Sequence, residues 1–264
     1  MALSGIGKLD RERITKLIRG TQHTIDLDET VTILNVSRSS ASKILSHLTS
    51  NGWMTRVKQG VYLPVPLESK TTDITLEDPW IIAEKLYAPC YIAGWSAAEY
   101  WGLTEQIFRT LVVFTTSTPR SRSPSLKGTS FLLHTVSSQS FFGLKSIWRG
   151  QIKVSVSDPS RTVLDCLINP KFGGGLPHSI DILWEYLRSE HKNLPLLLDY
   201  AKRLDNKAVF KRLGFLLEQH VPSEQEAIQQ CQAALTVSKT KLDPARADDN
   251  KLVTRWRLWV PRNG

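Results

Sequence analysis

The sequence lacks the features that mark several large classes of protein. No apolar run approaches the roughly 18–20 residues that a membrane span needs. The segment from Met1 to Asp10 holds no apolar stretch of signal-peptide length. The three cysteines, Cys90, Cys166 and Cys231, are odd in number and widely spaced, which argues against a disulfide framework and a zinc site. We therefore expect a cytoplasmic protein without a membrane partner.

Metal-binding and catalytic patterns are also missing. The six histidines are scattered, and none pairs with another ligand at metal-binding spacing. The one glycine cluster, Gly173 to Gly175, follows a predicted helix, so it lacks the strand-before, helix-after context of a phosphate-binding loop. The sequence thus predicts no catalytic residue, no metal and no cofactor.

Acidic residues are absent between Arg109 and Lys153, although seven basic residues lie there. The whole chain carries a formal net charge of +9, and an excess of that size favours polyanionic partners. One interpretation is an accessory surface that contacts phosphates, or that docks an RNA-bearing or acidic partner. The other is a solvated loop with scattered strand charges. The candidate accessory surface consists of Arg120, Arg122, Lys127, Lys145 and Arg149.

The first part of the chain has the element order of a DNA-binding module. Apolar residues at helical spacing predict helices over residues 10–20, 26–34 and 38–51, with a turn at 35–37 between the last two. Ser37 is placed to cap the third helix, and Gly52 to end it. Two short runs, 53–57 and 61–63, flank a glycine-containing turn and predict a hairpin. This order of elements, with two helices, a turn, a third helix and a hairpin, predicts a winged helix-turn-helix between Asp10 and Pro66.

The outward face of the third helix is suited to a major groove. It carries short hydroxyl side chains, which allow close approach, and cations, which bind guanine edges or phosphates. Residues 1–66 hold nine Lys and Arg against five Asp and Glu, and several of these acids lie at predicted helix starts. This leaves the third helix and the hairpin without acid. The predicted DNA contacts are Arg38, Ser39, Ser40, Ser42, Lys43 and His47 on the helix, and Arg56, Lys58 and Gln59 on the wing.

The rest of the chain predicts a second, larger α/β domain. We expect a winged helix over 1–66, a polar linker over 67–76, and a C-terminal domain over 77–264 made of a short sheet and a helical bundle, so the fold class is α+β. Strands are predicted over 111–115, 131–136, 152–156 and 254–260. Helices are predicted over 78–87, 95–103, 159–168, 178–190, 194–204, 207–219 and 224–235.

Two carboxylates in this domain leave an enzymatic alternative open. Asp158 and Asp165 could belong to a metal-dependent nuclease site. The structural interpretation is that Asp158 caps a helix with Pro159 in its first turn, while Asp165 pairs with Arg161 four residues earlier.

Six segments in order resemble the AbiE-type antitoxin and transcriptional regulator family, AbiEi. They run from Ser96 to Thr104, Ser157 to Asp165, Asn169 to Gly174, Lys211 to Glu218, Lys241 to Pro244 and Arg255 to Pro261. Most of these motif residues have a structural interpretation. Lys211 and Arg212 read as the basic edge of a packed helix, Gly214 as a close helix crossing, and Trp256 and Trp259 as opposite faces of a last strand.

The resemblance implies a bacterial antitoxin of a type IV toxin–antitoxin system linked to phage abortive infection. Such proteins repress their own operon through a winged helix on inverted repeats, and oppose a nucleotidyltransferase-like toxin without a stable complex. We therefore predict a non-enzymatic repressor and antitoxin that is associated with the nucleoid through double-stranded DNA. The alternatives are a nucleic-acid-processing enzyme targeted by a winged helix, and a winged-helix adaptor that binds protein.

Overall fold

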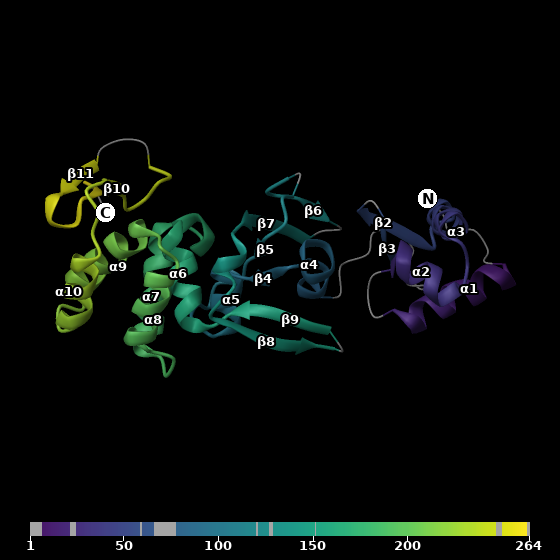
Figure 1. Cartoon of the computed structure of the whole chain (residues 1–264), viewed down its shortest axis with the longest axis horizontal. Helices are drawn as coiled ribbons and strands as arrows, with labels where there is room; N and C mark the ends of the chain where they lie inside the picture. The colour runs from purple at the N-terminus through teal and green to yellow at the C-terminus, as the bar shows by residue number, and fades with distance from the viewer. Residues whose placement is uncertain are drawn as a thin grey trace.

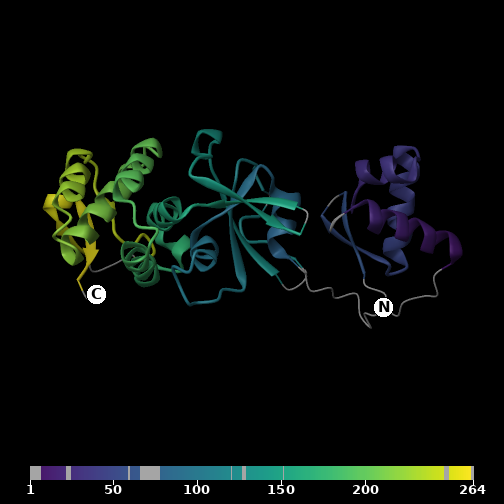
Figure 2. The same ribbon diagram turned by 90° about the horizontal axis from the view of Figure 1, so that it is seen from below.

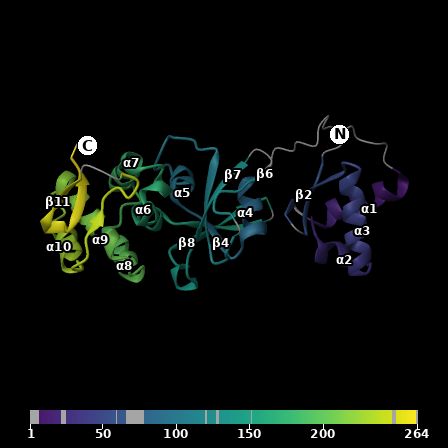
Figure 3. The ribbon, with the colours of Figure 1, turned by 90° about the horizontal axis from the view of Figure 1, so that it is seen from above.

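The parts of the chain follow one another along one long axis. The computed structural model describes residues 7–21, 25–58, 60–65, 78–119, 121–126, 129–150, 152–246 and 250–262. The N-terminal elements lie at one end, a six-stranded sheet in the middle, and helices with a small sheet at the other end (Figure 1). The two perpendicular views give the same order of parts (Figures 2 and 3). The predicted linker over 67–76 lies outside the described residues.

The N-terminal unit packs three helices against a small sheet. Its helices are α1 (Lys8–Gly20), α2 (Leu27–Leu34) and α3 (Arg38–Ser50), and its strands are β1 (Ile25–Asp26), β2 (Met54–Lys58) and β3 (Val61–Pro64). The sheet order is β1-β3-β2, and all pairs are antiparallel. A core that includes Leu17, Ile25 and Leu45 holds these elements together, because apolar residues at helical spacing face one another.

The six-stranded sheet forms the centre of the molecule. Its strands are β4 (Cys90–Ile92), β5 (Thr110–Thr115), β6 (Ser125–Leu126), β7 (Thr129–Thr135), β8 (Leu144–Arg149) and β9 (Ile152–Ser157), in the order β6-β7-β5-β4-β9-β8. Pairs β4·β9 and β5·β7 are parallel and the other pairs are antiparallel. Alternate residues of β5 enter different cores, with Val113 on one face and Phe114 on the other.

Helices close both faces of this sheet. Helix α4 (Pro79–Tyr87) contributes Trp80, Ile82 and Leu86 to the core on one face. Helix α5 (Gly94–Tyr100) contributes Trp95 to the core on the other face, where Phe172 of the short helix η2 (Pro170–Gly173) also packs. Another short helix, η1 (Ser138–Ser140), precedes β8.

A helical bundle follows the sheet. It contains α6 (Pro159–Ile168), α7 (Leu176–Arg188), α8 (Leu194–Arg203), α9 (Lys207–His220) and α10 (Gln225–Ala233). The largest apolar cluster of the described chain lies among these helices. The sequence prediction for this region is confirmed in element type and order, and Pro159–Ile168 is confirmed to the residue.

The last segment departs from its prediction. We expected one strand over 254–260, but Thr254–Trp256 forms the short helix η3 and Arg257 adopts a left-handed conformation with φ of 51°. The strand β12 starts only at Leu258 and ends at Pro261, between β10 (Thr240–Lys241) and β11 (Asn250–Val253). Trp256 is fully buried because the helical turn directs it into the bundle, where it meets α9.

The hairpin of the N-terminal unit contacts helix α4. Leu63 of β3 belongs to the same apolar cluster as Trp80 and Leu86, and Val57 and Val61 pack against that cluster. An ion pair of 2.9 Å between Lys85 Nζ and Glu29 Oε1 lies beside this contact. The chain is thus of the mixed α and β class, as predicted, and no helix within the described residues is long and apolar enough to cross a membrane.

Candidate nucleic-acid interface

Helix α3 is defined at both ends by the residues that the sequence indicates. Ser37 Oγ accepts a hydrogen bond of 3.2 Å from the backbone N–H of Ser40, so one free first-turn donor is satisfied. The helix stops at Ser50, and Gly52 follows with φ of 78°, a conformation that glycine adopts without strain. Both predicted boundary signals are confirmed. They fix where the helix begins and ends.

The outer face of α3 is a strip of small hydroxyls and one lysine. Ala41, Ile44, Leu45 and Leu48 are buried, which leaves the opposite side to solvent. The residues exposed there include Ser39, Ser42, Lys43 and Ser46. We call these four the α3 face. None of them contacts an acidic side chain among the described residues, and Lys43 has no hydrogen bond or ion pair there.

The serines near the start of α3 have different surroundings. Ser40 is half-buried, and its Oγ accepts a hydrogen bond of 2.9 Å from Ser37 Oγ. Ser39 Oγ lies 3.1 Å from Ser37 Oγ but stays exposed. Ser40 is therefore partly committed to the helix cap, whereas Ser39 and Ser42 remain accessible to a ligand of the helix.

Two predicted contact residues are held by acids from neighbouring helices. Arg38 pairs with Asp28 of α2, and both side chains are largely exposed. His47 Nε2 lies 3.0 Å from Asp10 Oδ2 of α1 and also near the amide of Asn51. The inference that the surface of the third helix is without acid is therefore wrong. No acid occurs in this stretch of sequence, but α1 and α2 bring Asp10 and Asp28 to its margins.

The hairpin places a further cation beside α3. Arg56 is exposed on β2, between the buried Thr55 and the half-buried Val57, as alternation along a strand requires. The backbone of Lys58 pairs with Val61 after a register irregularity. The side chain of Lys58 and the whole of Gln59 lie outside the described residues, so their predicted role is not tested.

The residues of the predicted accessory surface are divided between the two edges of the sheet. The carbonyl of Arg122 accepts a hydrogen bond from Leu133 N at the β6–β7 side. Lys145 and Arg149 lie on β8, the strand at the other edge. Arg120 and Lys127 are outside the described residues. The described members are therefore spread across the sheet, because a stretch that is continuous in sequence crosses it from one edge to the other. Their contact with phosphate stays a prediction.

Arg149 is engaged within the fold. Its guanidinium lies 4.5 Å from the centre of the Trp80 ring, and its Nε is 3.9 Å from Asp78 Oδ2. A cation on an indole face is favourable when partly desolvated. Arg149 is therefore less available to a phosphate than its sequence context suggests.

The carboxylates of the nuclease alternative are occupied by protein donors. Asp158 Oδ1 accepts from Arg161 N at 2.9 Å, and its Oδ2 accepts from the hydroxyl of Tyr200 at 2.9 Å. Asp165 Oδ1 accepts from Arg161 Nε at 2.9 Å, and both side chains are fully buried. The predicted cap and the predicted pair are both confirmed. These hydrogen bonds stabilise the start of α6 and its contact with Tyr200 of α8, which is a structural role.

The buried pair of Arg161 and Asp165 belongs to a larger hydrogen-bond network, in which the pKa of Asp165 is shifted. Burial raises the pKa of Asp165 to about 6, while Arg161 opposes the shift. Arg161 also donates to the hydroxyl of Tyr91 and to the carbonyl oxygens of Ser140 and Phe142. Asp165 Oδ2 is buried and has no hydrogen-bond partner among the residues that the structure describes. The network ties three separate segments together.

A second basic pair is interior rather than superficial. We expected Lys211 and Arg212 to form a basic edge, but both are buried. Arg212 donates to the carbonyl oxygens of Leu167, Ile168 and Lys241 at 2.8 Å, so it caps the end of α6 and fixes β10. Lys211 donates to Ser238. The prediction of a basic edge is wrong because these cations are buried and donate to backbone carbonyl oxygens of other segments.

Metal-ligating side chains do not gather in the parts of the chain that the structure describes. No group of three or more His, Cys, Asp or Glu side chains with metal-binding geometry occurs there. The three cysteines are buried as free thiols, and burial raises the pKa of Cys231 to about 12.

Comparisons with known proteins bear on the fold alone. No family model matches the chain, and no curated protein matches it with significance. Among solved structures, the RV2827C protein from Mycobacterium tuberculosis is similar, with a TM-score of 0.61 and 15% sequence identity over 98% of this chain and 94% of that one. At that identity the likeness shows that the two chains share a fold over nearly their whole lengths.

Proposed function

We propose that the α1–β3 unit is a winged helix-turn-helix that binds double-stranded DNA, and that the chain represses its own operon. One observation carries this proposal: the α3 face presents hydroxyls and Lys43 beside a hairpin with an exposed Arg56. Small side chains let a helix enter the major groove, and a lysine there bonds guanine O6 and N7 or a phosphate. Arg56 would contact the flanking backbone, which positions the helix.

The ion pair of Arg38 at the margin of α3 affects how much this residue is expected to contribute to DNA affinity. An exposed ion pair contributes only about 0–1 kcal/mol. A DNA phosphate can therefore displace Asp28 from Arg38 at little cost. Some of the gain of Arg38 on DNA is offset by the ion pair that it leaves. Lys43 has no such pair in the described chain, so we expect it to contribute more than Arg38 does.

The antitoxin role is supported by the resemblance of six ordered segments to the AbiEi family. We propose a cytoplasmic, nucleoid-associated bacterial antitoxin of a type IV system, without catalytic activity of its own. Two copies would occupy an inverted repeat in the operon promoter. The second domain would oppose a nucleotidyltransferase-like toxin without forming a stable complex with it.

A promoter fusion tests the repressor role. DNA from upstream of the gene drives a reporter in cells that receive the chain in trans. We expect the wild type to repress the reporter and Lys43→Ala to relieve most of the repression. Arg188→Ala is the matched control, because Arg188 is an exposed cation on α7 whose ion pair in the described part of the chain is with Glu185. Repression that Lys43→Ala leaves intact would refute the assignment of α3 to DNA.

Co-expression tests the antitoxin role separately. A neighbouring nucleotidyltransferase-like gene, expressed alone, should arrest growth, and this chain should restore growth without co-purifying with its product. Lys43→Ala should still restore growth if the second domain acts without DNA. Failure of the wild type to restore growth would refute the antitoxin proposal and leave the repressor proposal standing.

A further inference from the structure

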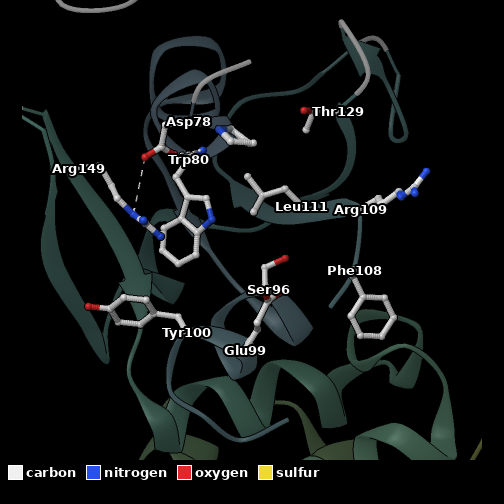
Figure 4. A pocket seen from close by; sticks show the side chains of 11 residues that line it. Asp78, Trp80, Ser96, Glu99, Tyr100, Phe108, Arg109, Leu111, Thr129 and Arg149 are labelled. Carbon is white, nitrogen blue, oxygen red and sulfur yellow. Dashed lines mark hydrogen bonds and ion pairs between the residues drawn. The ribbon is translucent and has the colours of Figure 1, made fainter. Parts of the chain in front are cut away.

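A cavity of about 500 Å³ opens beside helix α4, and no residue of α3 is among those that line it. Pockets for small ligands usually range over about 300–1,000 Å³. The walls come from four parts of the fold: the start of α4, the helix α5, the loop between α5 and β5 with Phe108 and Arg109, and the strands β5, β7 and β8. Figure 4 shows Trp80 on one side, Phe108 on the other, and Ser96 with Leu111 between them.

Aromatic rings dominate the apolar part of this cavity. Trp80 and Tyr100 contact each other at 5.5 Å between ring centres, and Phe108 stacks on Trp95 at 4.7 Å. Tyr100 is 41% exposed, so its ring is accessible to a ligand. Trp80 is buried, so Tyr100 offers the more accessible ring. An accessible aromatic ring stacks on planar ring systems, such as nucleobases, with modest dependence on substituent.

Two of the four charged groups that line the cavity neutralise each other. Asp78 Oδ1 accepts from the backbone N–H of Trp80 at 2.9 Å, and its Oδ2 faces Arg149. Arg149 lies over the indole of Trp80. This pair holds one wall in place and adds no net charge to the cavity.

The other two charged groups have no partner within the described residues. Neither the carboxylate of Glu99 nor the guanidinium of Arg109 takes part in a hydrogen bond or ion pair there. Burial raises the pKa of Glu99 above its ordinary value. Figure 4 shows Arg109 apart from Glu99, with its side chain extending away from it. A matching ligand therefore needs a donor edge for Glu99 and an anionic group at some distance from it.

We propose that this cavity binds a purine nucleotide with a guanine base, whose ring lies between the aromatic walls, whose donor edge faces Glu99 and whose phosphate meets Arg109. Guanine offers two adjacent N–H donors, which a carboxylate accepts as a pair. Adenine presents an acceptor at the same place, which a carboxylate repels. A free α-amino acid fits less well, because its ammonium and carboxylate sit on one carbon, whereas Glu99 and Arg109 stand apart.

Calorimetric titration of the full-length chain, without DNA, tests the site. The probes are guanosine monophosphate, adenosine monophosphate, guanosine and tryptophan. We expect the guanine nucleotide to bind at least about 10-fold more tightly than the adenine nucleotide, as one bidentate pair typically provides. Guanosine should bind about 10-fold more weakly than its monophosphate, because it lacks the charge-assisted bond to Arg109.

Three variants separate the contributions. Glu99→Gln should reduce the guanine preference to about twofold or less, because an amide serves donor and acceptor edges alike. Arg109→Ala should weaken the monophosphate about 10-fold and leave guanosine unchanged. Arg188→Ala, remote from the cavity, should bind like the wild type. Far-ultraviolet circular dichroism establishes that each variant is folded.

Several results would overturn the proposal. These are no binding of either nucleotide, equal binding of both with no effect of Glu99→Gln, or tighter binding of tryptophan than of the guanine nucleotide. Because the titrations contain no DNA, their failure would leave the DNA-binding proposal untouched, and failure of DNA binding would leave this site standing.

Discussion

Replacing Gly214 by alanine should destabilise the C-terminal part of the chain through one close contact. A Cβ at this position of α9 would lie 2.2 Å from Cζ3 and 2.3 Å from Cη2 of Trp256, and 2.7 Å from Cβ of Cys231. Trp256 is fully buried, and its Nε1 donates to Glu218 Oε2. The indole is therefore fixed on one side and enclosed on the others, and it cannot withdraw from the new methyl group.

The magnitude follows from two opposing effects. Alanine in place of glycine within a helix stabilises it by about 1 kcal/mol. Overpacking of a filled core costs typically about 1–3 kcal/mol, and occasionally more. With contacts as short as 2.2 Å on a buried ring, we expect a cost of about 3 kcal/mol or more. The net loss for Gly214→Ala should then be about 2 kcal/mol or more.

Urea unfolding followed by circular dichroism measures this loss. Trp256→Phe removes the far ring atoms, so the combination of Trp256→Phe with Gly214→Ala should lose at least about 1 kcal/mol less than the sum of the two single losses. Lys43→Ala, on the exposed face of α3, is the control that should leave the transition in place. A stabilising effect of Gly214→Ala would refute the packing argument.

Two further predictions concern buried charge. Burial, with Lys171 and Arg122, lowers the pKa of His134 from 6.5 to about 4. The unfolded chain thus binds a proton that the folded chain does not, and stability is lost as pH falls from about 6.5 to 4. Relative to His134→Phe, the wild type should lose about 1–2 kcal/mol over that range in acid-dependent urea unfolding, because solvent screens part of the effect at this half-buried ring, and parallel curves would refute this. Arg161→Met should cost about 3–5 kcal/mol, because Asp165 is left buried without its cation. Adding Asp165→Leu should recover most of that loss in the same assay, and a further loss instead would contradict the pairing.

The sequence predicts elements where local signals are strong. Ser37, Gly52 and Asp158 each mark a helix boundary through their own side chain or backbone freedom, and the structure confirms all three. The pair Arg161 and Asp165 was also predictable, because residues four apart share one helix face. These signals act within a few residues, so they can be read without knowledge of the fold.

Contacts between distant segments were not predictable in the same way. β4, at Cys90–Ile92, is only three residues long and gives no periodic signal, yet it lies between β5 and β9 in the central sheet. Asp28 reaches Arg38, and Asp10 reaches His47, only through the packing of α1 and α2 against α3. Charge counted along the sequence therefore overestimated how free of acid that surface is.

Buried cations were misjudged for a related reason. Lys211 and Arg212 were assigned to a surface because charged residues are seldom buried. Their donors instead satisfy carbonyl oxygens about 30 or more residues away in the chain, such as Leu167 and Leu242 for Arg212. The cavity beside α4 could not be predicted from the sequence either, because Trp80, Glu99 and Arg109 come together only in the folded chain.

The central claim is that α3 reads DNA, and fluorescence anisotropy tests it most directly. Labelled DNA from upstream of the gene and a scrambled duplex are titrated with the wild type, Lys43→Ala and Arg188→Ala at several salt concentrations. The account predicts a preference of at least about 100-fold for the upstream DNA, which Lys43→Ala largely abolishes and Arg188→Ala preserves. Loss of one phosphate contact should also reduce the steepness of the slope of log K against log salt concentration by about 0.9. Equal binding of both duplexes, unaffected by Lys43→Ala, would contradict the account.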